Sequence, residues 1–220
     1  MTTNKPTKRV RTKEFCKDIL LFWSGGADST FLMLQDLLAG NAVTATYVDI
    51  INNVQKSDRE RHARELLKKD ISKFCKYFDC EEPKYIPDHS ISVKGETFGN
   101  CPAPQQIIFA MFSMLIGLHF DEIHLGVVVG DSMAGSRFNR DIMEVCKQHF
   151  CGHFPRIEYP IESVSKETIY LALKGYDEVL GTHMVEHISC CESITEPCEE
   201  DKNCLPCKTQ DEVLKRLKWR

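Results

Sequence analysis

The sequence predicts an α/β fold with a doubly wound, mostly parallel sheet of about four or five strands. Short apolar or β-branched runs alternate with longer stretches of helical apolar spacing along most of the chain. A glycine-rich turn joins the first run to the first helical stretch, and only that stretch separates the first run from the second. This order is typical of a βαβ unit, the building block of parallel sheets.

The first predicted strand covers residues 19–23 and leads directly into the turn at residues 24–30, Ser-Gly-Gly-Ala-Asp-Ser-Thr. Apolar residues then recur at helical spacing over residues 31–38, and Gly40 is a typical helix stop. Residues 42–51 are apolar and β-branched, which predicts a second buried strand parallel to the first.

A long helix is predicted next, with Ser57 and Asp58 as its caps and an apolar face over residues 63–78. We interpret its other face, dense in Arg, Lys and Glu, mainly as solvated. Residues 84–86 predict a short strand, and residues 88–101 a loop beyond the sheet, where α/β folds commonly contact ligands.

The second half of the chain continues the alternation. Pro104 suits the first turn of a helix, and residues 122–129 predict a central strand in which His124 is a satisfied core histidine. The remaining predicted elements are a helix over 141–150, a strand over 157–161 and a helix from Ser165 to Gly175.

Length and composition favour one domain with a small appendage, because the chain has 220 residues. We expect a flexible basic tail over residues 1–17, an α/β domain over 18–182, and a cysteine-rich segment with a terminal helix over 183–220. The net charge of −4 does not require a nucleic-acid partner. No signal peptide or apolar run long enough for a bilayer is evident, so we expect a cytoplasmic protein without a membrane partner.

The turn at residues 24–30 has the chemistry of an anion site. Gly25 and Gly26 let the backbone turn against a phosphate, while Ser29 and Thr30 add hydroxyl donors at a helix start. No lysine ends the turn, so it is not a Walker A sequence. It resembles the Ser-Gly-Gly-x-Asp-Ser loop of the PP-loop, or N-type ATP pyrophosphatase, superfamily. The resemblance implies a Rossmann-like fold of the adenine nucleotide alpha-hydrolase type, with ATP held by Ser24, Gly25, Gly26, Asp28, Ser29 and Thr30.

Cysteine is concentrated near the end of the chain, where five of the eleven cysteines fall within residues 190–207. An odd count and the absence of a signal peptide argue against a disulfide framework. Cys204 and Cys207 form a C-x-x-C pair, Cys198 lies upstream of it, and Cys190 and Cys191 lie further back; four thiolates at such spacing can surround one tetrahedral Zn²⁺. A segment this polar has little core of its own, and a metal can replace it. An iron–sulfur cluster or unpaired cysteines are the alternatives.

The PP-loop together with this cysteine set resembles the 7-cyano-7-deazaguanine synthases (the QueC family). Their chains end in Ser-Cys, a spacer, a further Cys and a C-x-x-C, matched here by Ser189-Cys190, Cys198, Cys204 and Cys207. Weaker matches are Gly126 to Asp131, Arg140-Asp141 and the segment at 165–168. The resemblance covers residues 18 to 217 and indicates a divergent member.

The resemblance implies an ATP-dependent ligase or synthase. With Mg²⁺ and ATP it would adenylate the carboxylate of 7-carboxy-7-deazaguanine, and ammonia would then give the amide and, after a second activation, the nitrile. It implies that Asp28 orients the loop or contacts Mg²⁺, that Asp131 is a base or metal ligand, that Arg140 pairs with the substrate carboxylate, and that Lys166 neutralises phosphate. The family precedent suggests a homodimer.

Two departures keep other functions open. Residues 102–105 read Pro-Ala-Pro-Gln where the family has Pro-Gly-Arg-Asn, and residues 137–139 lack its aromatic-Pro-Asp sequence. One alternative is a ligase that passes the activated deazaguanine to an amine on a protein or nucleic acid. Another is a tRNA-thiolating PP-loop enzyme. The last is a non-catalytic zinc-ribbon module that binds nucleic acid through the basic C-terminus at 215–220, where Trp219 could stack on a base.

Overall fold

The fold is taken from a computed structural model of the chain. It describes residues 16–50, 54–91, 109, 111–128, 141, 144–145, 155–189 and 204–217. Several predictions fall outside these residues: most of the basic tail, the helix start at Pro104, and the site residues Asp131, Arg140, Cys190 and Cys198.

The main sheet has five strands, and every neighbouring pair in it is parallel. The strand order is β4-β2-β1-β6-β7, so the chain builds outward from the central strand to one edge and then returns to build the other. This confirms the predicted doubly wound α/β class. The strands are β1 (Asp18–Phe22), β2 (Ala42–Thr46), β4 (Lys84–Tyr85), β6 (Glu122–His124) and β7 (Arg156–Glu158).

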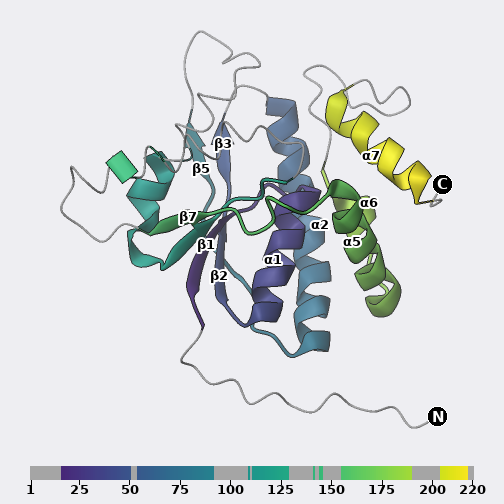
Figure 1. The fold of residues 1–220 in the computed structure, drawn as a ribbon, viewed down its shortest axis with the longest axis horizontal. Helices are drawn as coiled ribbons and strands as arrows, with labels where there is room; N and C mark the ends of the chain where they lie inside the picture. The colour runs from purple at the N-terminus through teal and green to yellow at the C-terminus, as the bar shows by residue number, and fades with distance from the viewer. Residues whose placement is uncertain are drawn as a thin grey trace.

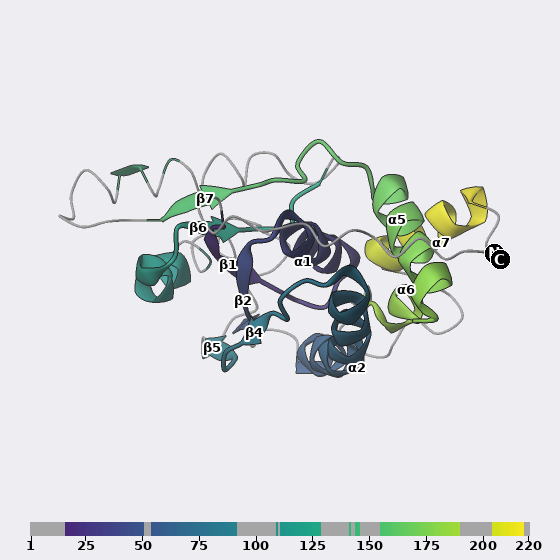
Figure 2. The same ribbon diagram turned by 90° about the horizontal axis from the view of Figure 1, so that it is seen from below.

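Three helices lie side by side against one face of the sheet, and two shorter helices pack beyond them (Figures 1 and 2). The three are α1 (Ala27–Ala39), α2 (Val54–Phe78) and α5 (Lys166–Leu180). The shorter ones, α6 (Met184–His187) and α7 (Leu205–Arg216), contact α5. Across the described residues, no helix is both long enough and apolar enough to cross a bilayer.

The central strand is buried on both faces, which explains its unbroken apolar sequence. Leu21 and Trp23 point into the core formed with α1, α2 and α5. Leu20 and Phe22 point into a second core on the opposite face, which includes residues of a helical segment at 111–116 followed by a 3-10 turn, η2 (Gly117–His119). Both sides of the sheet are therefore covered.

The predicted strand over residues 42–51 is divided at Tyr47. The Thr46 carbonyl still accepts a hydrogen bond from the backbone of Trp23 beside β1, whereas the Tyr47 carbonyl accepts one from His89. The backbone therefore changes partners at Tyr47, and β3 (Val48–Ile50) pairs with β5 (His89–Ile91) in a separate two-stranded sheet. This small sheet continues beyond the carboxyl end of β2.

Helix ends were predicted with mixed success. α1 ends at Gly40, whose φ of 87° is left-handed, as predicted. α5 begins after Ser165, whose side chain accepts from the Thr168 backbone, but the predicted stop at Gly175 is wrong. A Cβ at Gly175 would meet nothing within 4 Å, so this glycine serves no turn, and the helix continues to Gly181, whose φ is 61°.

Two other boundaries differ from the prediction. α2 already includes Val54, so Ser57 lies inside the helix, and its hydroxyl bonds Asp49 instead of capping the helix. The strand predicted over 122–129 ends at His124. The Leu125 backbone N–H still bonds the Glu158 carbonyl, but residues 125–128 leave the sheet toward the start of α1.

Candidate functional site

The turn that the sequence predicts to be a PP-loop, and which we refer to by that name, leaves the carboxyl end of β1 and enters α1. Gly25 has a φ of 79°, the left-handed conformation that favours glycine, and Gly26 is the extended N-cap of α1. Because the cap residue has no side chain, no side-chain oxygen covers the first-turn N–H groups of α1. These N–H groups and the helix dipole form an arrangement suited to binding an anion at the carboxyl end of β1. We call the turn at residues 24–26 together with the first turn of α1 the cradle.

Hydroxyl groups brace this loop from within. The Thr30 hydroxyl accepts a hydrogen bond from the Trp23 indole N–H at 3.0 Å and is fully buried. The Ser24 hydroxyl lies 3.2 Å from the Ser29 hydroxyl and accepts from the Gly26 backbone N–H at 3.3 Å. Ser24 and Ser29 therefore contact each other within the loop, whereas Thr30 ties the loop to the core.

Gly126 lies against the start of α1. A Cβ added at this residue would be 3.0 Å from the Ser29 backbone nitrogen and 3.2 Å from the Asp28 carbonyl carbon. Any larger residue would fill the space in front of the first-turn N–H groups. The chain leaving β6 thus passes beside the start of α1. Because Gly126 has no side chain, the first-turn N–H groups stay uncovered on that side.

Asp28 and Lys166 contact each other beside the start of α1. The Lys166 ammonium forms an ion pair with the Asp28 carboxylate, although the two residues are 138 positions apart. Their side chains are 29% and 18% exposed, so both remain reachable from solvent. The fold therefore brings one cation and one anion, both predicted as site residues, to the anion-binding end of α1.

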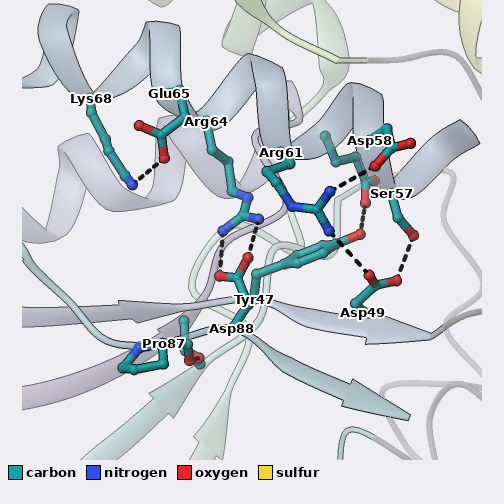
Figure 3. A network of polar contacts seen from close by, with 12 residues as sticks. Tyr47, Asp49, Ser57, Asp58, Arg61, Arg64, Glu65, Lys68, Pro87 and Asp88 are labelled. Atoms are coloured by element: carbon teal, nitrogen blue, oxygen red, sulfur yellow. Dashed lines mark hydrogen bonds and ion pairs between the residues drawn. The ribbon is translucent and has the colours of Figure 1, made fainter. Parts of the chain in front are cut away.

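A second polar cluster, which we call the Tyr47 network, lies where β2 continues into β3 and faces the first turns of α2 (Figure 3). The Tyr47 hydroxyl donates to Glu60, and the Ser57 hydroxyl donates to Asp49 at 2.5 Å. Arg61 lies 3.6 Å from Asp49. Burial, and then the negative charge of Glu60, raise the pKa of Tyr47, so its hydroxyl stays protonated and donates.

Arg64 joins this network to the PP-loop. Its Nη1 and Nη2 atoms each donate to Asp88 at 2.7 Å, and its guanidinium carbon lies 4.2 Å from the centre of the Tyr47 ring (Figure 3). Burial acts to raise the pKa of Asp88, but the hydrogen bonds and charge of Arg64 outweigh it, so this pKa is lowered. Asp88 is therefore ionised whenever the protein is near neutral pH.

The residues that sequence reasoning missed are Asp49, Glu60, Arg64 and Asp88. Asp49 carried a signal, since it is the one charged residue in the apolar run at residues 42–51 that was predicted as a buried strand. Arg64 and Glu60 carried none, because they lie on the α2 face that was interpreted as solvated. Both are buried, and that interpretation is wrong for them.

Two of the four predicted metal ligands are described. Cys204 is the N-cap of α7, and Cys207 is buried in its first turn. Residues three apart share one face of a helix, so both thiols can approach one ion. Cys190 and Cys198 lie outside the described residues, and within those residues no group of three or more His, Cys, Asp or Glu side chains forms a metal site.

No protein-family model and no curated protein matches the chain. Solved structures do. One is the U34-tRNA thiolase NcsA from Methanococcus maripaludis with its [4Fe-4S] cluster, at 16% identity and a TM-score of 0.44, with 91% of this chain and 65% of that one covered. Another is the NMN synthetase from Francisella tularensis, at 12% identity and a TM-score of 0.32, with 89% and 76% covered. The chain thus spans less than two thirds of the thiolase.

Proposed function

We propose that this chain is an ATP-dependent enzyme of the PP-loop type that activates a carboxylate as its adenylate. The substrate that fits the sequence resemblance best is 7-carboxy-7-deazaguanine, converted with ammonia to 7-cyano-7-deazaguanine or its amide. The observation that carries the proposal is the cradle at the start of α1. Gly25 there has a left-handed backbone conformation, and Gly26 at the N-cap position has no side chain that could cover the first-turn N–H groups. Gly126 leaves the same N–H groups uncovered on the opposite side.

The residues around the cradle fit a nucleotide triphosphate. Backbone N–H groups at the start of α1 and the hydroxyls of Ser24 and Ser29 would hold the β and γ phosphates. Asp28 would contact Mg²⁺, which supplies charge neutralisation on the phosphates when bound. Lys166 reaches the same place by its ion pair with Asp28, and it would stabilise the leaving pyrophosphate.

Two further roles rest on the sequence resemblance alone. Arg140 would pair with the substrate carboxylate through a bidentate contact. Asp131 would act as the base that takes a proton from the attacking nitrogen, or as a ligand of the metal. A guanidinium holds a planar carboxylate in one orientation, which aligns its oxygen with the α-phosphorus. These roles complete the proposed chemistry of carboxylate attack, loss of pyrophosphate and displacement of AMP.

The cysteine segment is proposed to hold a structural Zn²⁺ through Cys190, Cys198, Cys204 and Cys207. The chemistry of the two described donors fits, because Cys204 at the N-cap position and Cys207 in the first turn of α7 place two sulfur ligands suited to zinc at one end of the helix. Zinc would supply folding free energy to a segment poor in apolar residues. Metal analysis of the purified chain by mass spectrometry would give one zinc per chain, lost in Cys207→Ser and kept in Cys75→Ser. Iron and sulfide in its place would favour a cluster.

The decisive experiment incubates the full chain with Mg·ATP, 7-carboxy-7-deazaguanine and ammonium, and measures nucleotide products and product mass. We expect AMP and pyrophosphate, with a mass corresponding to the nitrile or amide. An adenylate that accumulates without either product would favour the ligase that uses an amine on a protein or nucleic acid. Release of ADP, or no acid-dependent turnover, would contradict the proposal.

A tRNA-thiolating activity is the second candidate, and one contact favours it. The Ser189 backbone N–H bonds the Gly25 carbonyl at 3.1 Å, and the residue that follows Ser189 in the chain is Cys190. Thiolation requires a cysteine or a cluster close to the adenylated substrate. AMP formation stimulated by tRNA and not by the deazapurine acid would select this function.

A further inference from the structure

The Gly25 turn of the PP-loop is enclosed by two elements that are distant in the sequence. A Cβ added at Gly25 would lie 2.9 Å from Arg64 Cγ and 3.3 Å from the Glu60 carbonyl oxygen, both on α2. The segment that follows α6 makes the second contact, because the Ser189 N–H donates to the Gly25 carbonyl at 3.1 Å. The turn therefore packs on a side chain of α2 and is hydrogen-bonded to the end of α6.

The Arg64 side chain under this turn is held rigidly. Its guanidinium makes two hydrogen bonds to Asp88 and lies over the Tyr47 ring, and the side chain is only 7% exposed. Its buried Nε has no hydrogen-bond partner among the described residues, which is costly for a charged group. The contacts with Asp88 and Tyr47 therefore hold the Arg64 stem beneath Gly25, in a place where its Nε is buried.

The other contact is anchored as well. His187 Nδ1 lies 2.7 Å from Asp70 Oδ2, which ties α6 to α2, and the Asp70 side chain is 4% exposed. Asp177, near the end of α5, accepts from the first two backbone N–H groups of α6 at 2.7 and 3.0 Å. The start of α6 and its last residue are both held, so Ser189 reaches the PP-loop from a fixed support.

We propose that Arg64 and Ser189 are positioning residues that hold the Gly25 turn in the geometry that receives the phosphates of ATP, an inference that rests on the proposed function. The contacts form a closed ring: α2 supports Gly25 through Arg64, Gly25 bonds Ser189, and His187 of α6 returns to Asp70 of α2. The conformation of the loop is therefore set by residues outside it, including Ser189, which directly precedes Cys190 in the chain.

The sharpest test changes one backbone hydrogen bond. Ser189→Pro removes the N–H that bonds Gly25, whereas Ser189→Ala keeps it. Ile188, the preceding residue, has φ −63° and ψ 131°, an extended conformation that is compatible with a following proline, so the change does not strain that residue. We measure hydrogen exchange of the peptide spanning residues 24–30 in the nucleotide-free full chain. Exchange should rise about three- to tenfold in Ser189→Pro only, the effect expected for one lost hydrogen bond.

A second arm addresses Arg64. Arg64→Ala removes the stem beneath Gly25 and should increase exchange in the same peptide and weaken Mg·ATP binding, measured by calorimetry, about tenfold. Arg64→Lys keeps most of the stem but loses the bidentate pairing with Asp88, so it should restore both only in part. The matched control is Lys68→Ala, one turn further along α2, where the ammonium pairs with Glu65 of the same helix. This control should match the wild type.

The outcomes separate the two proposals. Unchanged exchange in Ser189→Pro, or an equal rise in Ser189→Ala, would overturn the positioning role even if ATP binds and is hydrolysed to AMP. If the exchange pattern appears as described while the wild type does not bind Mg·ATP, the ring of contacts stands and the proposed function fails. Weaker ATP binding in Ser189→Pro together with faster exchange supports both.

Discussion

Two charged clusters of the main sheet differ in how far solvent reaches them. One lies where the parallel strands begin, which we call the amino edge, and the other beyond the ends of the strands, which we call the carboxyl edge. At the amino edge, Glu122, the first residue of β6, lies 3.1 Å from the His124 ring, and Asp36, near the end of α1, lies 2.8 Å from the same ring; all three side chains are 5 to 8% exposed. At the carboxyl edge, the Asp28–Lys166 pair and Asp88 are 18 to 34% exposed. The first cluster is closed and the second is open to a ligand.

The difference indicates how this fold divides stability from chemistry. Buried charges are tolerated at the amino edge because each negative group has a positive partner, which ties α1 to the sheet. At the carboxyl edge the pairs join elements that are distant in sequence, and solvent can still reach them. A ligand can exchange with an open pair at modest cost, whereas the closed cluster can be changed only by weakening the fold.

The largest expected effect separates chemistry from stability at the carboxyl edge. Lys166→Met should lower the rate of AMP formation about a hundredfold, since in the proposed function the Lys166 ammonium neutralises charge on the leaving pyrophosphate. The melting temperature should change by less than about 2 °C, because a partly exposed ion pair contributes little to stability. Steady-state assays and thermal melts measure the two quantities.

The control for this change is Lys174→Met, two turns further along α5, which should leave both measurements at wild-type values. A Lys166→Met protein that turns over ATP normally would leave the open pair without a catalytic role. The comparison of the two edges would then be one of exposure only.

The next effect lies at the amino edge, where we expect a loss of stability with little change in ATP binding. His124→Ala should lower the free energy of unfolding by about 3 kcal/mol, because it leaves two buried carboxylates without their shared partner. Urea denaturation gives this free energy, and Mg·ATP affinity measured well below the melting temperature should stay within twofold of the wild type. His119→Ala, an exposed histidine shortly before β6, is the control and should be neutral. A similar loss in both variants would contradict the closed cluster.

These two edges also show what the sequence could and could not predict. The glycine-rich turn, its helix and the alternation of strands were predictable, because glycines, caps and apolar period are local signals. Lys166 was a candidate from its motif, yet its meeting with Asp28 depends on how α5 packs beside α1. His124 was correctly predicted as a satisfied core residue, but nothing in the sequence names Asp36 as its partner, which lies 88 positions earlier.

The errors have the same origin. Tyr47 looks like the middle of a strand, and only the position of β5 makes the backbone change partners there. Arg64 looks solvated in a helix rich in charge, and only Asp88 and the Tyr47 ring allow it to be buried. Gly175 looks like a stop because glycine is a poor helix former, but the packing of α5 overrides that weak preference. Local signals cannot report such contacts.

A smaller effect is the dependence of stability on pH. Burial acts to lower the pKa of His124, but hydrogen bonds and charge from Asp36 and then Glu122 outweigh it, so this pKa is raised. The stabilisation is complete below the ordinary value of 6.5 and is lost as the pH rises through the raised value. The stability difference between the wild type and His124→Gln should therefore shrink as pH increases from 5.5 to 9.

Glu122 sets the acid limit of the same window. Burial acts to raise its pKa, but the hydrogen bonds of Lys17 and His124 outweigh it, so this pKa is lowered. Its stabilisation is present above the ordinary value of 4.5 and is lost as the pH falls through the lowered value. Urea midpoints measured across this pH range should show the largest stability difference between the wild type and His124→Gln between pH 4.5 and 6.5. A difference that does not vary with pH would mean that the cluster does not titrate.

The smallest effect tests how far the closed cluster extends. Lys17 pairs with Glu122 at 2.7 Å, but its side chain is 51% exposed, so water already solvates the ammonium. Lys17→Met should therefore cost less than about 1 kcal/mol of unfolding free energy, the usual range for exposed pairs, and salt should reduce the cost further. Urea denaturation at low and high salt measures it. A cost as large as that of His124→Ala would mean that the cluster depends on this exposed charge, and the amino edge would then be as open as the carboxyl edge.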